Sequence, residues 1–235
     1  MISAGQPQDD ARHSPLAFRI LTLPQIGTPG QIVILNGTPR SGKSSIAAVI
    51  QDTFAGVWMN VGVDRCKPMT PDRYQPGIGL RPGGERPDLE PLIVLLYRTM
   101  YEAIALHSRL GLNVVVDVGH HDAYSVPREI LPACARQLAG LPVLFVGVRC
   151  PLAVVMDRRH AIWGVGTAAS VVPEAVRLWQ QAVHVPGIYD LELDTSMLSA
   201  EECAAVIHQR LADGPPPTAF QRLAAMTTGE ERAPM

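Results

Sequence analysis

The amino-acid sequence predicts an α/β fold in which a parallel sheet is covered by helices on both faces. Short apolar runs rich in Val, Ile and Leu alternate along the chain with longer segments of helical spacing. The first run, residues 32–35, leads through a glycine-containing loop directly into a helix-forming segment. The length of 235 residues suits one domain of this class with extensions at its ends.

The first half of the chain supplies two predicted strands and a long irregular segment. A strand over 32–35 precedes the glycine loop, and the next helix opens at Lys43. A second strand over 57–63 ends at Asp64. Residues 66–88 contain five prolines and four glycines, too many for a packed element. A segment of this length and composition inside a compact domain predicts a functional loop or lid.

The second half continues the alternation of helices and strands. A helix over 89–110 is stopped by Gly111, and the β-branched run 113–117 is typical of a buried parallel strand. The later predicted elements are a helix at 127–139 with Pro near its first turn, a strand at 142–148, a helix at 152–160, a glycine-containing loop at 163–169, a helix at 173–184, a strand at 191–194 and a terminal helix opened by a capping box at 199–202.

Composition divides the chain into three parts. Residues 1–30 form a predicted N-terminal extension, 31–213 the domain, and 214–235 a C-terminal tail that is Pro-rich and then polar. Both ends are expected to be loosely held, although the short apolar patch 16–23 could pack on the domain. We assign these ends no chemistry.

Charge and cysteine content favour a small-molecule partner. The net charge is −2 and no Lys/Arg-rich run occurs, which disfavours a nucleic-acid surface. The four cysteines form no C-x-x-C pair, so neither a zinc site nor a disulfide framework is expected. The sequence shows no leader-like start and no stretch of 18 apolar residues, so we expect a cytoplasmic protein without a membrane partner. A homo-oligomer remains possible.

The glycine loop has the pattern G-x-x-x-x-G-K-S, between a strand and a helix as a phosphate-binding loop requires. Its glycines let backbone N–H groups point at phosphate oxygens, and the helix dipole adds positive potential there. Lys43 would reach the β and γ phosphates, and Ser44 would offer its hydroxyl to Mg²⁺. Only two of the 20 basic residues are lysines, which makes a chance match less credible. The predicted nucleotide-binding residues are Gly37, Thr38, Pro39, Arg40, Ser41, Gly42, Lys43, Ser44 and Ser45.

Two aspartates follow predicted strands, where ligands bind in open α/β sheets. Asp64 could accept the proton of an attacking hydroxyl during phosphoryl transfer; an N-cap or turn aspartate is the alternative. Asp117 ends an apolar run in the manner of a Walker-B strand, where the acid holds Mg²⁺ directly or through water.

Three further groups of residues have less specific patterns. Arg149 after the fourth strand, and Arg158 with Arg159 in the next helix, could neutralise a transferring phosphate. The adjacent pair His120-His121 seldom converges on one metal ion, so a polar pocket wall or a solvent face is favoured. Trp179 is interpreted as a core aromatic.

Several segments together resemble the chloramphenicol 3-O-phosphotransferase family of P-loop kinases. They are the loop that ends in Gly42-Lys43-Ser44, the Gly-Val-Asp segment at 62–64, the strand 114–117, the Gly-Val-Arg-Cys segment at 147–150 and the region from His184 to Thr195. The resemblance implies a kinase-like fold with a central five-stranded parallel sheet, ATP as phosphoryl donor and Asp64 as general base. It also implies a hydroxyl of a small antibiotic as acceptor. The chain departs from the family in lacking an arginine-rich stretch after Arg159 and in the segment 66–88.

Two classes of function therefore remain at the level of sequence. The first is an ATP- and Mg²⁺-dependent small-molecule kinase, whose acceptor is a chloramphenicol-like antibiotic, a metabolite or, as in toxin-type kinases, a sugar nucleotide. The second is a nucleotide-binding regulatory protein that transfers no phosphate. Loss of transfer with retained ATP binding in Asp64→Asn would favour the first.

Overall fold

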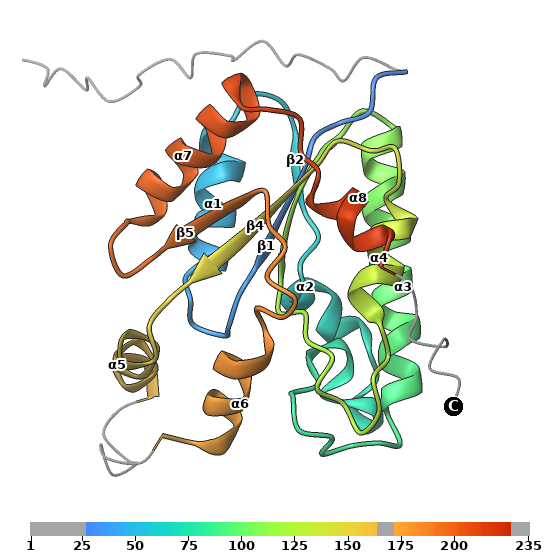
Figure 1. Cartoon of the computed structure of the whole chain (residues 1–235), viewed down its shortest axis with the longest axis vertical. Coiled ribbons are helices and arrows are strands. Elements are labelled where there is room, and N and C mark those ends of the chain that lie inside the picture. The colour runs from blue at the N-terminus through green and yellow to red at the C-terminus, as the bar shows by residue number, and fades with distance from the viewer. Residues whose placement is uncertain (1–26, 164–171, 227–235) are drawn as a thin grey trace, which may run out of the picture.

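The computed structural model describes residues 27–163 and 172–226, and it contains one five-stranded parallel sheet (Figure 1). The strand order is β2-β3-β1-β4-β5, and every adjacent pair is parallel. The strands are β1 (Ile32–Asn36), β2 (Trp58–Asn60), β3 (Asn113–Val118), β4 (Val143–Arg149) and β5 (Leu191–Asp194). The parallel five-stranded sheet that the sequence predicted is thus confirmed.

Helices cover both faces of the sheet (Figure 1). One face packs against α1 (Lys43–Thr53) and α7 (Ala200–Asp213), and the other against α3 (Glu90–Arg109), α4 (Ile130–Gln137) and α8 (Ala219–Ala224). The remaining elements are α2 (Val63–Cys66), α5 (Leu152–Trp163), α6 (Glu174–Ala182) and three short 3₁₀ turns, η1 (Lys67–Met69), η2 (Asp72–Tyr74) and η3 (Gly77–Gly79). Within the described residues, no helix is both long and apolar enough to cross a bilayer.

The central strand β1 is buried on both sides. Ile32 and Ile34 pack in the core beneath α3 and α4, whereas Val33 and Leu35 pack in the core beneath α1 and α7. Side chains of a strand alternate between faces, so a run without polar residues is the pattern expected of a doubly covered strand. The loop after β1 therefore emerges at the middle of the sheet edge formed by the carboxyl ends of the strands.

The second predicted strand is shorter than expected, and Asp64 does not end it. The strand was predicted over 57–63, but β2 stops at Asn60 and a short helix, α2, begins at Val63. As an edge strand, β2 pairs only with β3, and the N–H groups of Arg65 and Cys66 bond to the carbonyl of Gly62 instead of a strand. Asp64 consequently lies in the first turn of α2.

Most helix boundaries agree with the sequence, but α4 begins later than predicted. It starts at Ile130 rather than near Pro127, because the N–H groups of Arg128 and Glu129 bond to the Asp122 carboxylate, at 2.7 and 3.0 Å. The capping box at Ser199 is confirmed. The predicted loop 163–169 lies outside the described residues beyond the end of α5, as do residues 1–26 of the extension predicted over 1–30.

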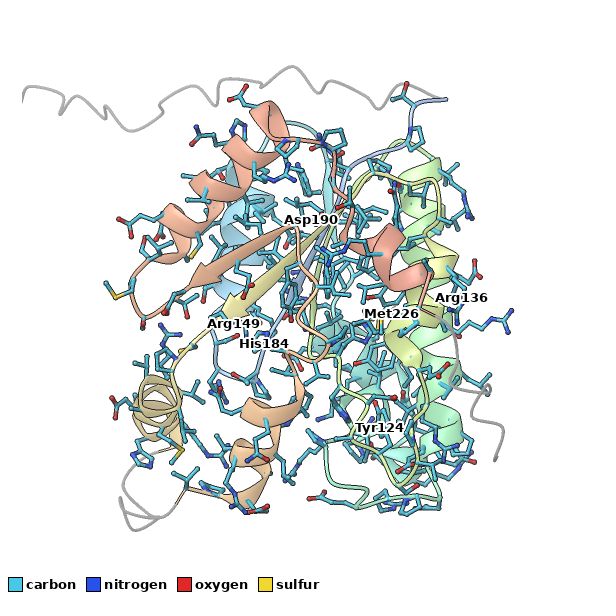
Figure 2. The ribbon with its side chains drawn as sticks, in the orientation of Figure 1. Tyr124, Arg136, Arg149, His184, Asp190 and Met226 are labelled. Atoms are coloured by element: carbon cyan, nitrogen blue, oxygen red, sulfur yellow. The ribbon has the colours of Figure 1, made fainter. Side chains whose placement is uncertain are left out.

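The expectation of a loosely held tail from residue 214 is wrong for residues 219–224, which form α8. Phe220 and Leu223 of this helix are buried, and the Phe220 ring lies 5.1 Å from that of Phe145 on β4. The Asp190 carboxylate accepts hydrogen bonds from the backbone N–H groups of Thr218, at 2.7 Å, and Ala219, at 2.9 Å. Figure 2 shows Asp190 between the start of β5 and α8. Apolar spacing within a Pro-rich segment thus builds a packed helix.

Candidate active site

The loop between β1 and α1 has the conformation of a phosphate cradle. Arg40 and Gly42 both have positive φ, 70° and 94°, which turns successive N–H groups inward. A Cβ at Gly37 would lie 2.4 Å from the carbonyl oxygen of Val148, so only glycine lets the loop pass this close to β4. The first N–H groups of α1 have no intrahelical partner, as in any helix, and α1 has no acidic residue in its first turn. The loop is thus suited to an anion.

Lys43 lies against the inside of this loop. Its Nζ donates to the carbonyl oxygens of Gly37, at 2.9 Å, and Thr38, at 2.7 Å. Burial lowers the pKa of Lys43 to about 8, and the negative charges of Asp117 and Asp64 act in the opposite direction. The ammonium is therefore held where loop and carboxylates meet.

Ser44 and Asp117 form the contact that a magnesium site would need. The Ser44 hydroxyl donates to Asp117 Oδ2 at 2.7 Å, and Asp117 is 7% exposed. The parallel register sets Asp117 of β3 beside Leu35 of β1, on the face covered by α1. The predicted pair therefore meets, although its residues are 73 positions apart.

Asp64 projects from α2 without capping a helix. The N-cap of α2 is Gly62, so Asp64 is not the N-cap residue; it lies in the first turn of α2, as the turn-aspartate alternative expects. Asp64 is exposed, and its charge is close enough to Lys43 to raise that residue's pKa. A Cβ at Gly62 would come within 1.6 Å of Asp117 Oδ1, so the turn into α2 passes directly over Asp117. Asp64, Asp117 and Lys43 thus belong to one site.

Arg158 of α5 reaches the outer side of the loop. Its guanidinium donates to the carbonyl oxygens of Arg40, at 3.3 Å, and Thr195, at 2.6 Å, and to the Thr195 hydroxyl, at 3.1 Å. The Thr195 hydroxyl in turn donates to the carbonyl oxygen of Ser41 at 2.7 Å. Arg158 therefore ties α5, the end of β5 and the loop together, and Thr195 is a site residue that the motif analysis did not single out.

Arg149, in contrast, makes side-chain contacts with Glu192 and Tyr189. It forms an ion pair with Glu192 of β5 at 2.6 Å, and its guanidinium lies 5.8 Å from the centre of the Tyr189 ring. Figure 2 shows Arg149 and His184 near the carboxyl end of β4. The structure thus brings Arg158 to the loop and gives Arg149 other partners.

The remaining loop positions differ in exposure. Thr38 and Ser41 are buried, whereas Pro39 and Ser45 lie at the surface. The Thr38 hydroxyl has no hydrogen-bond partner among the described residues.

The two histidines after β3 line a wall and are not placed as metal ligands. His120 Nε2 bonds to the Tyr101 hydroxyl at 2.7 Å, and His121 Nε2 bonds to the Leu80 carbonyl oxygen at 3.1 Å. Both rings are buried, which lowers the pKa of His120 to about 3 and that of His121 below its usual value. Across residues 27–163 and 172–226, no group of three or more His, Cys, Asp or Glu side chains is placed to hold a metal.

Trp179 belongs to the same wall, which corrects its interpretation as a core residue. Its ring lies edge-on to His121 with centroids 5.0 Å apart. A Cβ at Gly119 would come within 2.8 Å of the Trp179 ring and 3.4 Å of the Gly37 carbonyl oxygen. α6 therefore places an aromatic side chain next to the phosphate-binding loop.

Glu90 anchors the segment that carries this wall. It is fully buried at the start of α3, and its carboxylate accepts from Ser125 N, at 2.7 Å, Ser125 Oγ, at 2.6 Å, and Arg128 Nη2, at 2.8 Å. Burial alone would raise the pKa of Glu90, but these hydrogen bonds bring it below its usual value. No local sequence pattern indicated this anchor, because its partners lie more than 30 residues away.

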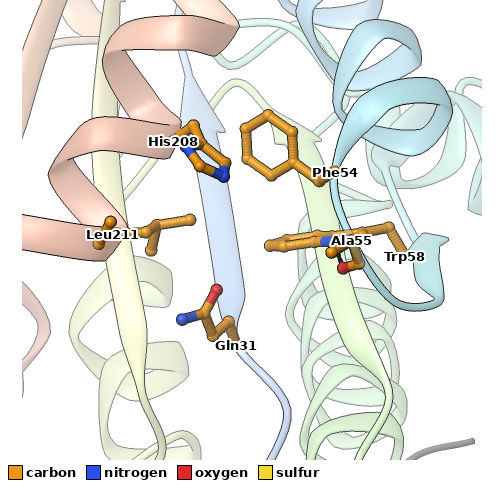
Figure 3. Close-up of a pocket in the computed structure, with 7 residues that line it drawn as sticks. Gln31, Phe54, Ala55, Trp58, His208 and Leu211 are labelled. Atoms are coloured by element: carbon orange, nitrogen blue, oxygen red, sulfur yellow. Dashed lines mark hydrogen bonds between the residues drawn. The ribbon is translucent and has the colours of Figure 1, made fainter. Parts of the chain in front are cut away.

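A separate small cavity lies at the other end of the sheet, away from the loop (Figure 3). It encloses about 160 Å³ near the starts of β1 and β2, and Gln31, Phe54, Trp58 and His208 are among its lining residues. The Phe54 ring packs edge-on against both Trp58 and His208.

Comparison with known proteins places the chain in a family. The model of the family described as chloramphenicol phosphotransferase-like protein matches residues 30–212. The chain belongs to this family. Relatives in two strains of Mycobacterium tuberculosis, named "Putative O-phosphotransferase Rv2636" (H37Rv) and "Putative O-phosphotransferase MT2714" (CDC 1551), are each 29% identical over 214 residues, covering 83% of this chain and 88% of the relative.

Solved structures support the fold of this chloramphenicol phosphotransferase-like protein. The APS kinase CysC of M. tuberculosis, solved with AMPPNP and APS, superposes with a TM-score of 0.55 at 17% identity, over 79% of this chain and 99% of its own. A sugar kinase from Janibacter sp. superposes with a TM-score of 0.54 at 16% identity, over 84% of this chain and 100% of its own. The expected P-loop kinase-like fold is confirmed.

Proposed function

We propose that this chloramphenicol phosphotransferase-like protein transfers the γ-phosphate of ATP to a hydroxyl group of a small molecule. The observation that carries the proposal is the convergence of Lys43, the Ser44–Asp117 pair and the exposed carboxylate of Asp64 at one edge of the sheet. A phosphate cradle alone would serve binding. An exposed aspartate beside the cradle, whose charge bears on Lys43, favours chemistry on an acceptor.

The donor set fits Mg²⁺. A buried carboxylate and a hydroxyl 2.7 Å apart are the hard oxygen groups this ion prefers, and nucleotide phosphates commonly complete its coordination. Ser44 and Asp117 would hold the ion, which when bound neutralises charge on the phosphates.

Lys43, Asp64 and Arg158 would have different roles in the transfer. Lys43 would exchange the loop carbonyls for phosphate oxygens and draw negative charge toward the leaving side. Asp64 would accept the proton as the acceptor oxygen forms its bond to phosphorus and the bond to the ADP oxygen breaks. Arg158 would hold the loop and the Thr195 segment around the nucleotide.

The acceptor is proposed to lie between Asp64 and the wall of His121 and Trp179. The His121 ring is held by Leu80, which belongs to the Pro/Gly-rich segment after Asp64. Aromatic faces on this side favour an acceptor that carries a ring next to its hydroxyl. A chloramphenicol-like antibiotic satisfies that description, and a sugar nucleotide of the kind used by toxin-type kinases is the alternative acceptor.

The test is ADP release by purified protein with Mg²⁺ and ATP, alone and with a panel of hydroxyl-bearing antibiotics and sugar nucleotides. Lys43→Ala should abolish release. Asp64→Asn should lower transfer by at least about 100-fold while AMPPNP binding is retained. Asp52→Asn, at the exposed far end of α1, is the matched control and should behave as wild type.

The same experiment separates the proposal from a regulatory role. Tight AMPPNP binding with no acceptor-dependent ADP release would favour a nucleotide-sensing protein. Equal activity of Asp64→Asn and wild type would remove Asp64 as the base.

A further inference from the structure

Asn36, the last residue of β1, is 1% exposed, and its side chain joins three separate segments. Its Oδ1 accepts from the N–H of His120 at 2.7 Å. Its Nδ2 donates to the carbonyl oxygen of Val183 at 2.8 Å and to the hydroxyl of Tyr189 at 2.9 Å. Both amide hydrogens and the amide oxygen are thus used. The loop after β3, the end of α6 and the approach to β5 are all held by the residue that precedes Gly37.

The contact between the Tyr189 hydroxyl and His184 Nδ1 extends this network. Because the Tyr189 oxygen accepts from Asn36, its own proton is available for His184 Nδ1 at 2.8 Å. When the Tyr189 hydroxyl donates in this direction, Nδ1 carries no proton, and the neutral ring has its proton on Nε2. Burial raises the pKa of Tyr189 to about 12, so the phenol keeps its proton.

The surroundings of His184 keep its ring neutral. Burial lowers the pKa of His184 to about 4, and the charges of Arg149 on β4 and Lys43 on α1 act in the same direction. Glu192 on β5 acts in the opposite direction. Among the described residues, these are the charged groups that act on the His184 ring from the elements around it.

The end of α6 matters because of what this helix carries. Val183 directly follows α6, and Trp179, one turn earlier, lies against Gly119 and His121 beside the phosphate-binding loop. A shift at Val183 would therefore move Trp179. The short route from Gly37 through Asn36 to Val183 links the phosphate side of the site to the wall proposed to contact the acceptor.

We propose that Asn36 is a positioning residue that, with Tyr189 and His184, fixes the C-terminal end of α6 relative to the phosphate-binding loop. The importance of α6 for an acceptor rests on the proposed function, whereas the network itself does not. The tests below are therefore chosen so that the two can fail separately.

The first test is a histidine NMR titration, with the His184 signal identified by its loss in His184→Gln. In the wild type, His184 should show the Nε2-protonated form and no titration between pH 5.5 and 8. Tyr189→Phe keeps the ring that packs on Gly147 but removes the hydroxyl, and should raise the titration midpoint by at least one unit. A wild-type midpoint near 6.5, or no change in Tyr189→Phe, would overturn the proposed network.

The second test is hydrogen exchange of residues 179–189 with and without Mg²⁺-AMPPNP. Asn36→Asp keeps the shape but loses the NH₂ group that donates to both Val183 and Tyr189, and should speed exchange there at least tenfold. Asn113→Asp is the matched control, because it keeps the oxygen that accepts from Gln31 N–H at the amino end of the sheet. It should exchange as wild type does.

Hydrogen exchange in the presence of nucleotide distinguishes the positioning role of Asn36 from the proposed function. AMPPNP should slow exchange at 179–189 in the wild type and fail to do so in Asn36→Asp. Unchanged exchange in Asn36→Asp, or an equal increase across the whole sheet, would overturn the positioning role. If AMPPNP does not bind the wild type, the proposed function fails, while the titration and the nucleotide-free exchange still judge Asn36. Should Asn36→Asp not fold, Tyr189→Phe undergoes the same exchange measurement.

Discussion

Replacing Glu90 by Gln tests how the wall of the candidate active site is held. The substitution keeps the shape of a fully buried side chain but removes its charge. One carboxylate oxygen accepts from Ser125 N, and the other accepts from Ser125 Oγ and from two guanidinium nitrogens of Arg128. In Glu90→Gln, an NH₂ group replaces one of these oxygens and therefore faces the hydrogen-bond donors that this oxygen had accepted from. The segment between β3 and α4, which carries His121, would lose its main attachment to α3.

The cost can be worked out from these contacts. A hydrogen bond to a charged group contributes about 1.5–3 kcal/mol, and breaking a buried ion pair costs about 3–5 kcal/mol. The Arg128 side chain is 26% exposed, so water would recover part of its solvation. We expect Glu90→Gln to lower the free energy of unfolding by about 2–4 kcal/mol, a large part of the roughly 5–15 kcal/mol typical of a domain.

Urea denaturation of both proteins at pH 7 measures this quantity. The expected result is a lower midpoint with an unchanged slope, because a lost contact changes stability and not the surface exposed on unfolding. Asp88→Asn is the control, since its ion pair with Arg86 lies in solvent and should leave the midpoint unchanged. A loss below about 1 kcal/mol in Glu90→Gln would refute the reasoning that this buried carboxylate holds the segment.

Three other outcomes are expected. Gly62→Ala places a Cβ within 1.6 Å of Asp117 Oδ1 and should weaken Mg²⁺-dependent AMPPNP binding at least tenfold by calorimetry, whereas Gly79→Ala, which has more room, should not. Burial lowers the pKa of His120 from 6.5 to about 3, so the unfolded chain takes up this proton at a higher pH than the folded chain does. Urea denaturation should therefore give a free energy of unfolding that is about 2–3 kcal/mol lower at pH 4.5 than at pH 6.5. A flat pH profile would contradict this. A chain ending at residue 213 lacks α8 and its two large buried side chains, and thermal unfolding should show about 3–6 kcal/mol less stability; an unchanged Tm would show that α8 contributes little.

The sequence was sufficient for the features that follow from local pattern. Alternating apolar runs predicted the parallel sheet, and the glycine spacing predicted the conformation around Lys43. Asp117 was predicted to serve the same ion as Ser44, and the two side chains meet because parallel register aligns the ends of β1 and β3. These predictions depend on spacing along the chain or on a general property of parallel sheets.

Features that depend on distant partners could not be predicted. Asn36 bonds to residues 84, 147 and 153 positions away, and nothing around it in the sequence marks these contacts. The start of α2 was missed because the chain leaves the edge strand early over Gly62. α8 was missed because three successive prolines suggested an irregular tail, although Phe220 and Leu223 have the spacing of one helical face.

The close approach of Gly62 to Asp117 limits how the two sides of the site can change. Gly62, two positions before Asp64, is fixed by the carboxylate of Asp117, so the entry into the segment proposed to contact the acceptor cannot vary alone. From Lys67 to Tyr74 the chain crosses the surface in short turns with largely exposed side chains. Under the proposed function, variation in that stretch would alter which molecule is accepted while the residues proposed to bind the phosphate donor stay in place. A fixed turn followed by a surface segment is an arrangement that would allow the proposed acceptor to change without rebuilding the phosphate-binding loop.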